Sequence, residues 1–299
     1  IMDGGSTDES LKIIEKYSES LYYWESKLDH GQSHAINKGF KMATGDIISW
    51  LNSDDKLCEG ALWCVAKYFT NHPEKHLIHG SGLFFDGKGR YWSPSKNYSD
   101  IEARYITHFC FDMQPSVFFR KHVLDEVGFL DETFNLQFDT ELFVRIALNY
   151  GILQIDEKLS FFRLHDLRKS KIEYPKLLYP HEFVCLYSRV LRSLQESEIT
   201  FKDVDRYIRI VEYLGLFSRE VVKYPVRKTF DPQLLERSIF IYLKRCCGFF
   251  YHIFDYDRTL QILRILEKEF PHHYISNEEL QRISKRLPIT KVLRKLPKW

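Results

Sequence analysis

Apolar, strand-like runs alternate with helical segments along the first half of the chain, and this alternation limits the fold more than any other feature. A strand tail over residues 1–5 precedes a predicted helix, because Ser6 and Glu9 have the spacing of a capping box. A short aromatic strand over 21–26 is followed by a helix over 33–43 and then by the apolar run GDIISWL. The pattern predicts an α/β fold with a mixed, mostly parallel sheet flanked by helices.

Four polar residues that favour turns follow the last of these strands. The run GDIISWL is followed directly by Asn52, Ser53, Asp54 and Asp55. Parallel α/β sheets bind ligands at the carboxyl ends of their strands, and Asp3 stands at another such end. Adjacent carboxylates are stabilised by a cation, and Mg²⁺ or Mn²⁺ prefers oxygen ligands. The turn is therefore a candidate site for a metal and a nucleotide diphosphate, with a plain solvated turn as the alternative.

Four sequence blocks strengthen the first interpretation. In order along the chain they are IMDGGSTDES, GQSHAINKGFKMATGDIISWLNSDD, QPSVFFRKHVLDEVGFLDETF and FDTELFVRIA. Together they resemble the pattern of glycosyltransferase family 2, which has the GT-A fold. The resemblance implies a GT-A domain over residues 1–165 that lacks its first strand, because that strand would precede Ile1. It also implies that the sequence is a fragment of a longer chain.

The same resemblance implies residues that bind a nucleotide-sugar donor. The Asp of the first block touches the nucleoside in this family, and its counterpart here is Asp3. Capping of its own glycine turn is the alternative for this residue. Gln32 and Asn37 match the block that lines the donor site, and Asn52 and Asp54 belong to the acidic block. Asn52 stands where the family carries an Asp, so that position keeps an oxygen but has no charge.

A metal site and a catalytic base are implied in the same way. The expected ligands of Mn²⁺ or Mg²⁺ are Asp54, Asp55 and the His165 of the block FFRLH, although a His at a loop edge is often simply solvated. Asp139 matches the general base, which removes a proton from the acceptor hydroxyl in an inverting transfer. A plain helix N-cap, with Glu141 interacting with the helix dipole, is the alternative for Asp139.

The acceptor side is less defined by the sequence. Gln114 and Glu141 are expected to lie there, next to loops around residues 85–115. The acceptor implied by the resemblance is a glycan or a lipid-linked molecule, as in the synthesis of cell-envelope polysaccharides.

The second half of the chain has few strand-like runs and many helix-forming residues, so we predict a helical C-terminal region over residues 166–299. Its tail is basic, interleaved with apolar residues, and contains Arg282, Lys285, Arg286, Lys291, Arg294, Lys295 and Lys298. Such a tail suits an anionic membrane surface, while a solvated helix is the alternative. The formal net charge of the whole chain is only +2, which argues against nucleic acid as a partner.

The cysteines and the hydropathy bear on location. The six cysteines are spread without CxxC spacing: Cys58, Cys64, Cys110, Cys185, Cys246 and Cys247. They predict free thiols in a reducing compartment, and no apolar run approaches the length of about 20 residues that spans a bilayer. The expected location is the cytoplasm, with peripheral attachment to the cytoplasmic membrane face.

Three functions compete at this point. The favoured one is a metal-dependent hexosyltransferase that moves a sugar from a nucleotide-diphosphate donor with inversion. A sugar nucleotidyltransferase would need a glycine-rich basic phosphate loop near its first strand, and none is visible. The third is a degenerate, non-catalytic relative that acts as a membrane-tethered binding protein, which Ile36 and Asn52 favour.

Overall fold

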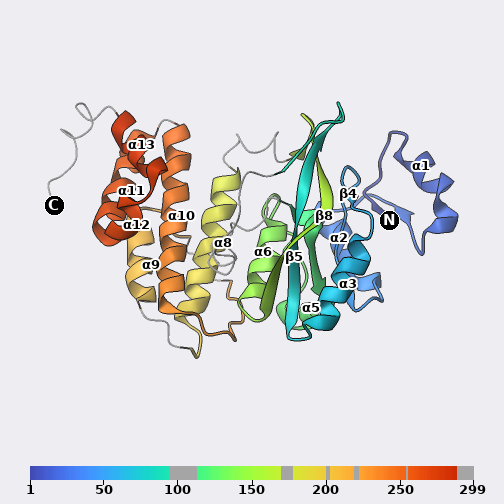
Figure 1. Ribbon diagram of the computed structural model, residues 1–299, viewed down its shortest axis with the longest axis horizontal. Coiled ribbons are helices and arrows are strands. Elements are labelled where there is room, and N and C mark those ends of the chain that lie inside the picture. Colours follow the sequence, from blue (N-terminus) through green and yellow to red (C-terminus); the bar gives the residue numbers. More distant parts are fainter. Residues whose placement is uncertain (94–112, 170–177, 200–202, 219–221, 254, 288–299) are drawn as a thin grey trace. The chain divides into compact units, whose positions relative to one another are not determined.

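The computed structural model describes residues 1–93, 113–169, 178–199, 203–218, 222–253 and 255–287, and the chain divides into two compact units (Figure 1). The first unit comprises residues 1–186 and 224–228, and the second comprises 187–223 and 229–299. The predicted α/β class with a helical C-terminal region is confirmed. The first unit runs past the predicted domain boundary at residue 165.

The first unit contains the sheets and the shorter helices. Its strands are β1 (Met2–Asp3), β2 (Glu25–Ser26), β3 (Ile47–Ile48), β4 (Lys56–Leu57), β5 (Lys75–Asp86), β6 (Tyr91–Trp92), β7 (Val117–Arg120) and β8 (Gly151–Leu164). Its helices are α1 (Ser10–Lys16), α2 (Gln32–Met42), α3 (Ala61–Asn71), α5 (Val123–Val127), α6 (Phe138–Ala147) and the short 3₁₀ turns η1 (Ser18–Ser20) and η2 (Gln114–Ser116). Helix α8 (Leu178–Gln195) begins in this unit and ends in the second.

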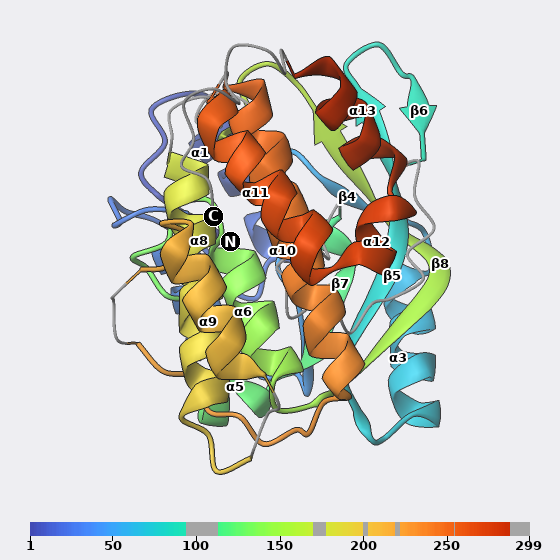
Figure 2. The same ribbon diagram turned by 90° about the vertical axis from the view of Figure 1, so that its left-hand side faces the viewer.

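The larger sheet has the strand order β3-β7-β5-β8-β4, with β6 beside β5. Strands β5 and β8 are parallel and run side by side along most of their length (Figure 2). The other pairings in this sheet are antiparallel, and β1 and β2 form a separate two-stranded parallel sheet. The sheet is mixed, as expected, but antiparallel pairings outnumber parallel ones. Alternation along the sequence predicts that strands exist, and it does not specify which strand pairs with which.

Two neighbouring phenylalanines show how the sheet is covered on both faces. Successive residues of a strand point to opposite faces. Phe118 packs with Val65 and Phe69 of α3 in one apolar cluster. Phe119 contacts Phe40 of α2 and Phe143 of α6 instead, with ring centroids 5.7 and 6.3 Å away. Helices α3 and α6 therefore lie on opposite faces of the sheet (Figure 1).

The first helix begins later than the capping box predicted. Helix α1 starts at Ser10 and has no side-chain cap. The hydroxyl of Ser6 donates to Oδ1 of Asp3 at 2.5 Å. This contact, rather than the expected reciprocal cap with Glu9, uses the Ser6 side chain and explains the shorter helix.

The second unit is helical. Besides the end of α8 it contains α9 (Val204–Tyr213), α10 (Pro232–His252), α11 (Tyr256–Glu269), α12 (Pro271–Ile275) and α13 (Glu278–Arg286), of which α10 and α11 lie side by side (Figures 1 and 2). Asp231, Asp255 and Asn277 cap α10, α11 and α13 by accepting from backbone N–H groups at 2.9 to 3.2 Å. Tyr187 and Tyr242 stack in its core with centroids 3.8 Å apart.

Three further expectations from the sequence can be compared with the structure. Arg282, Lys285 and Arg286 of the basic tail lie on α13, whereas Lys291, Arg294, Lys295 and Lys298 fall outside the described residues. In the described ranges no helix combines the length and the apolar character that crossing a membrane requires. Five cysteines have free thiols, and Cys110 falls outside the described residues.

Candidate functional site

A hydrogen-bonded cluster is centred on Asn52, at the start of the acidic turn. Oδ1 of Asn52 accepts from Nε2 of Gln32 at 2.8 Å, and Gln32 is the first residue of α2. Nδ2 of Asn52 donates to Oδ2 of Asp55 and to Oε1 of Gln114, both at 3.3 Å. Gln114 in turn donates to the carbonyl of Trp50 at 3.0 Å. The structure therefore brings four predicted residues together, namely Gln32, Asn52, Asp55 and Gln114.

Asp55 is buried within this cluster. Its Oδ1 accepts from the backbone N–H of Arg163 on β8 at 3.0 Å, and its Oδ2 accepts from Asn52. Burial raises the pKa of Asp55 to about 6, and the charge of Asp54 adds to the increase, while the hydrogen bonds from Arg163 and Asn52 oppose it. Both carboxylate oxygens thus have donors within the chain, so this geometry gives Asp55 an internal role more readily than that of a metal ligand.

Asp54 points to a different partner. Its Oδ2 lies 2.9 Å from Nε2 of His165, and the two side chains are 35% and 32% exposed. The two residues are 111 positions apart in the sequence, and they meet because β4 and β8 pair directly beside them. In the described ranges no group of three His, Cys, Asp or Glu residues is arranged to hold a metal ion. Asp54 and His165 are the two predicted ligands that do lie together.

Asp3 stands at the end of β1, in the separate two-stranded sheet. Its Oδ2 accepts from the hydroxyl of Ser26 and from the N–H groups of Gly5 and Ser6, at 2.6, 3.0 and 2.9 Å. Together with the Ser6 hydroxyl on Oδ1, these bonds lower the pKa of Asp3 to about 2, with the bond from Ser26 as the largest cause. The expected capping of its own turn is present, and contact with a nucleoside stays a prediction.

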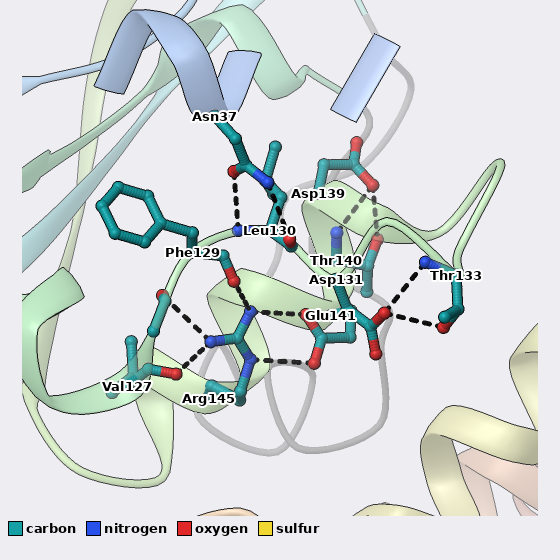
Figure 3. A network of polar contacts seen from close by, with 11 residues as sticks. Asn37, Val127, Phe129, Leu130, Asp131, Thr133, Asp139, Thr140, Glu141 and Arg145 are labelled. Carbon is teal, nitrogen blue, oxygen red and sulfur yellow. Dashed lines mark hydrogen bonds and ion pairs between the residues drawn. The ribbon is translucent and has the colours of Figure 1, made fainter. Parts of the chain in front are cut away.

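Asn37 lies in the interior, behind the loop that precedes α6 (Figure 3). Its Oδ1 accepts from the N–H of Leu130 at 3.0 Å, and its Nδ2 donates to the Leu130 carbonyl and to Glu132 at 3.0 and 2.9 Å. Asn37 is a buried side chain whose oxygen and nitrogen both have partners in the chain. In the structure it holds the 130–132 loop in place, and a place for it in the donor site stays a prediction.

Asp139 lies in the first turn of α6 and is half-buried. Its Oδ1 accepts from the N–H and the hydroxyl of Thr140 at 2.6 and 3.2 Å (Figure 3). Burial raises the pKa of Asp139 to about 6, and the charge of Glu182 adds to the increase. The N-cap position belongs to Gln137 rather than to Asp139, so the alternative of a plain N-cap does not describe this residue.

Glu141 has a structural role. It is buried, and both its oxygens accept from Arg145, at 2.8 Å from Nε and 2.7 Å from Nη2 (Figure 3). Arg145 also donates to the carbonyls of Val127, Gly128 and Phe129, so the pair fastens α6 to the preceding loop. Contact of Glu141 with the acceptor stays a prediction, and in this structure both of its oxygens are paired with Arg145.

One residue that the sequence did not indicate completes this part of the site. Glu182 of α8 accepts from the N–H groups of Asn135, Leu136 and Gln137 at 2.7, 2.9 and 2.9 Å. These groups directly precede α6 and Asp139. No local motif surrounds Glu182, and the contact spans up to 47 residues, so no short sequence pattern could have shown it.

The acidic turn and the start of α6 belong to one region. Trp50, two residues before Asn52, stacks on Phe143 of α6 with centroids 5.5 Å apart. Helix α2 contributes Gln32 to the first cluster and Asn37 to the loop before α6, and five residues of helix span only about 8 Å. The candidate base and the candidate diphosphate site are therefore both connected to helix α2 and to the stacked pair Trp50 and Phe143.

Comparisons with known proteins find that this chain is similar to glycosyltransferases. Residues 1–128 match the family model described as glycosyl transferase family 2. A PGL/p-HBAD biosynthesis glycosyltransferase of Mycobacterium bovis is 26% identical over 157 residues, which are 51% of this chain and 59% of that protein. An uncharacterized glycosyltransferase of Nostoc sp., alr2836, is 23% identical over 177 residues, or 55% of each chain. The chain thus spans less than two thirds of the length of these relatives.

A solved structure shows the same fold. The crystal structure of S. aureus TarS 1-349 in complex with UDP-GlcNAc superposes with a TM-score of 0.51 and 16% sequence identity. The match covers 94% of this chain and 73% of that one. At this level of identity the likeness concerns the fold alone.

Proposed function

Residues 1–128 of this chain match the family model of glycosyl transferase family 2, and on this basis we propose that the protein is an inverting hexosyltransferase that uses a nucleotide-diphosphate sugar. The observation that carries the proposal is Asp139, a half-buried carboxylate with a pKa raised to about 6 in the region that also holds the acidic turn. An ordinary surface Asp titrates near 3.9 and is a weaker base.

The proposed reaction uses Asp139 as the general base. At neutral pH its carboxylate is ionised, because its pKa of about 6 lies below 7. It accepts the proton of the acceptor hydroxyl as the hydroxyl oxygen bonds to the anomeric carbon of the donor sugar. The bond from that carbon to the diphosphate oxygen breaks on the opposite side, and the nucleotide diphosphate leaves. Attack opposite the leaving group inverts the anomeric configuration.

Asp54 and His165 are the residues that fit a divalent cation. Their oxygen and nitrogen already lie 2.9 Å apart on a half-exposed edge, and Mg²⁺ typically takes only one or two protein carboxylates besides water and phosphate oxygens. Mn²⁺ or Mg²⁺ bound there would neutralise charge on the departing diphosphate. Asn52, Gln32 and Gln114 place neutral hydrogen-bonding groups beside this pair without adding a further negative charge.

The proposed donor and acceptor are supported by the comparisons with known proteins. The related fold of TarS was crystallised with UDP-GlcNAc, which makes that nucleotide sugar the first donor to test. We propose a glycan or lipid-linked acceptor in the synthesis of cell-envelope polysaccharide, and the matched mycobacterial relatives, which are named PGL/p-HBAD biosynthesis glycosyltransferases, support a role in biosynthesis. The cationic side chains of α13 support peripheral contact with an anionic membrane.

Calorimetric titration tests the donor site. UDP-GlcNAc is titrated into the full chain with Mn²⁺ and again with a chelator, with GDP as a comparison ligand. We expect saturable binding that chelation abolishes and that Asp54→Ala weakens by at least about tenfold, because a ligand to the metal is lost. Asp46→Ala is the matched control, since Asp46 is an exposed Asp that directly precedes β3. Binding that survives both chelation and Asp54→Ala would contradict the metal-assisted site.

Product analysis then separates transfer from mere binding. A folded protein that binds UDP-GlcNAc but releases no UDP with any glycan or lipid-linked acceptor would favour the non-catalytic relative instead. Release of UDP that requires both Asp54 and Asp139 would establish the transferase.

A further inference from the structure

Helix α6 begins without a side-chain cap of its own. Its N-cap residue is Gln137, and that side chain makes no capping hydrogen bond. The first N–H groups of a helix have no partners within the helix and need acceptors from elsewhere. At this helix the need coincides with the candidate base, because Asp139 lies in the same first turn.

Glu182, from another helix, supplies acceptors for the backbone that leads into α6. Its Oε1 accepts from the N–H of Asn135 at 2.7 Å, and its Oε2 accepts from those of Leu136 and Gln137, both at 2.9 Å. The Glu182 side chain is buried, with 7% of its residue surface exposed. A buried carboxylate is stable only when it is neutralised or well hydrogen-bonded, and three N–H donors meet that condition. Both oxygens have donors, so Glu182 is not itself arranged to take a proton from a substrate.

We propose that Glu182 is a positioning residue for the general base: it fixes the backbone that precedes Asp139 and brings a carboxylate charge close to that side chain. This inference rests on the proposed function, because it assigns Glu182 a part in the same proton transfer. It differs from a purely structural capping role in one respect. A cap needs only oxygen acceptors, whereas the proposed role also needs the charge.

The other charged groups around the start of α6 leave this role to Glu182. Glu141 is paired with Arg145 along the helix, so the two charges offset each other. Lys169 donates from Nζ to the Asn135 carbonyl at 2.8 Å and lies over the Phe138 ring at 5.9 Å. Burial is the largest cause of the raised pKa of Asp139, the hydrogen bonds from Thr140 oppose it, and the charge of Glu182 adds to the increase.

The first test needs no substrate. Glu182→Gln keeps a side-chain oxygen for the N–H groups and removes the charge. The titration of Asp139 is followed by NMR of the protein with ¹³C-labelled aspartate, and Asp139→Asn assigns the signal. We expect the pKa of Asp139 to fall in Glu182→Gln while staying above its ordinary value, because burial is the largest cause of the increase and is unchanged. An unmoved titration in a folded Glu182→Gln protein would overturn the proposal.

The second test is kinetic. In Glu182→Gln we expect kcat at pH 8 to fall about 3- to 10-fold, part of the contribution of a general base, while the KM of the donor stays within about twofold. The acid limb of the kcat profile should move to lower pH. Glu196→Gln is the matched control, because Glu196 follows the same helix and pairs with Lys223 on the surface, where such pairs contribute little.

The outcomes separate this inference from the proposed function. If wild type transfers sugar and Asp139→Asn does not, while Glu182→Gln keeps the wild-type pH profile, only the role of Glu182 fails. If wild type transfers no sugar, the proposed function fails, and the NMR titration still decides whether Glu182 tunes Asp139. Should Glu182→Gln not fold, Glu182→Asp replaces it, since its carboxylate is drawn back by one methylene. A wild-type kcat in that variant would overturn the positioning role.

Discussion

Asp3 at the end of β1 and Asp139 in the first turn of α6 differ in the donors that reach their carboxylates. Asp3 accepts four hydrogen bonds from Gly5, Ser6 and Ser26, and its pKa is lowered to about 2. Asp139 accepts from the N–H and hydroxyl of Thr140, lies partly buried, and has a pKa raised to about 6. The first environment keeps a fixed negative charge at any physiological pH. The second keeps a carboxylate that can take up a proton.

The largest effect should come from removing the proton acceptor. Asp139→Asn preserves the size of the side chain but cannot accept a proton, so we expect kcat to fall by roughly 10²- to 10⁴-fold. The measurement is the rate of UDP release with acceptor at pH 8. Asp3→Asn should leave kcat much closer to wild type, because its carboxylate takes no part in proton transfer. A larger kcat loss from Asp3→Asn than from Asp139→Asn would reverse the comparison.

The pH profile sharpens the same contrast. Asp139 must be ionised to act, so activity should decline below about pH 6, approaching tenfold per pH unit. Asp3 titrates near pH 2, far outside the assay range, and Asp3→Asn should keep the acid limb where it is. The kcat of both proteins is measured from pH 5 to pH 9. If Asp3→Asn shifted the acid limb, then Asp3 rather than Asp139 would be the carboxylate that must be ionised for activity.

Stability should respond in the opposite direction at Asp139. Its pKa is higher in the folded protein than in the unfolded chain, so the folded state loses stability as pH rises from about 4 to about 6. Asp139→Asn removes this penalty, and we expect a gain of about 1–3 kcal/mol in the free energy of unfolding at pH 7. Urea denaturation at pH 7 and pH 4 measures it. The gain should vanish near pH 4, and an equal gain at both values would point to another cause.

The smallest effect is expected at Asp3. Its lowered pKa means that ionised Asp3 stabilises the fold above the unfolded pKa, and that this contribution is lost as pH falls from about 4 to about 2. Asp3→Asn should therefore destabilise the protein by about 1 kcal/mol at pH 7, since an amide oxygen accepts more weakly than a carboxylate. Thermal unfolding checks it. A stabilised Asp3→Asn protein would break the contrast between the two sites.

The sequence predicted the parts of this site that depend on local order. The run GDIISWL ends in the acidic turn, and the blocks around Asp54 and His165 carried enough of the family pattern to place them together. It gave no sign of the internal contacts of polar residues such as Asn37 and Glu141. Asn37 bonds to Leu130, 93 positions away, so its amide gives no local sign that it is buried. Glu141 looks like a surface residue of a first helical turn until Arg145 is seen to cover it.

The pairing of strands and the contact of Glu182 with the segment before α6 were beyond sequence reasoning for a related reason. Whether β7 lies beside β5, and in which direction, depends on the packing of several elements at once. No spacing rule connects Glu182 with residues 135–137. Tertiary contacts thus determine how the candidate base is held, whereas the sequence only indicates which residue it is.

Helix α8 has a consequence for modularity, since its residues are shared: Glu182 belongs to the first unit and Tyr187 to the second. A recombination joint placed at residue 165, where the family blocks end, would exchange the first unit without the Glu182 carboxylate that holds the segment before the proposed base. Chimaeras between relatives should therefore tolerate a crossover after Leu186 and lose turnover with one before Leu178. The same boundary would restrict how freely evolution can exchange the helical half for another.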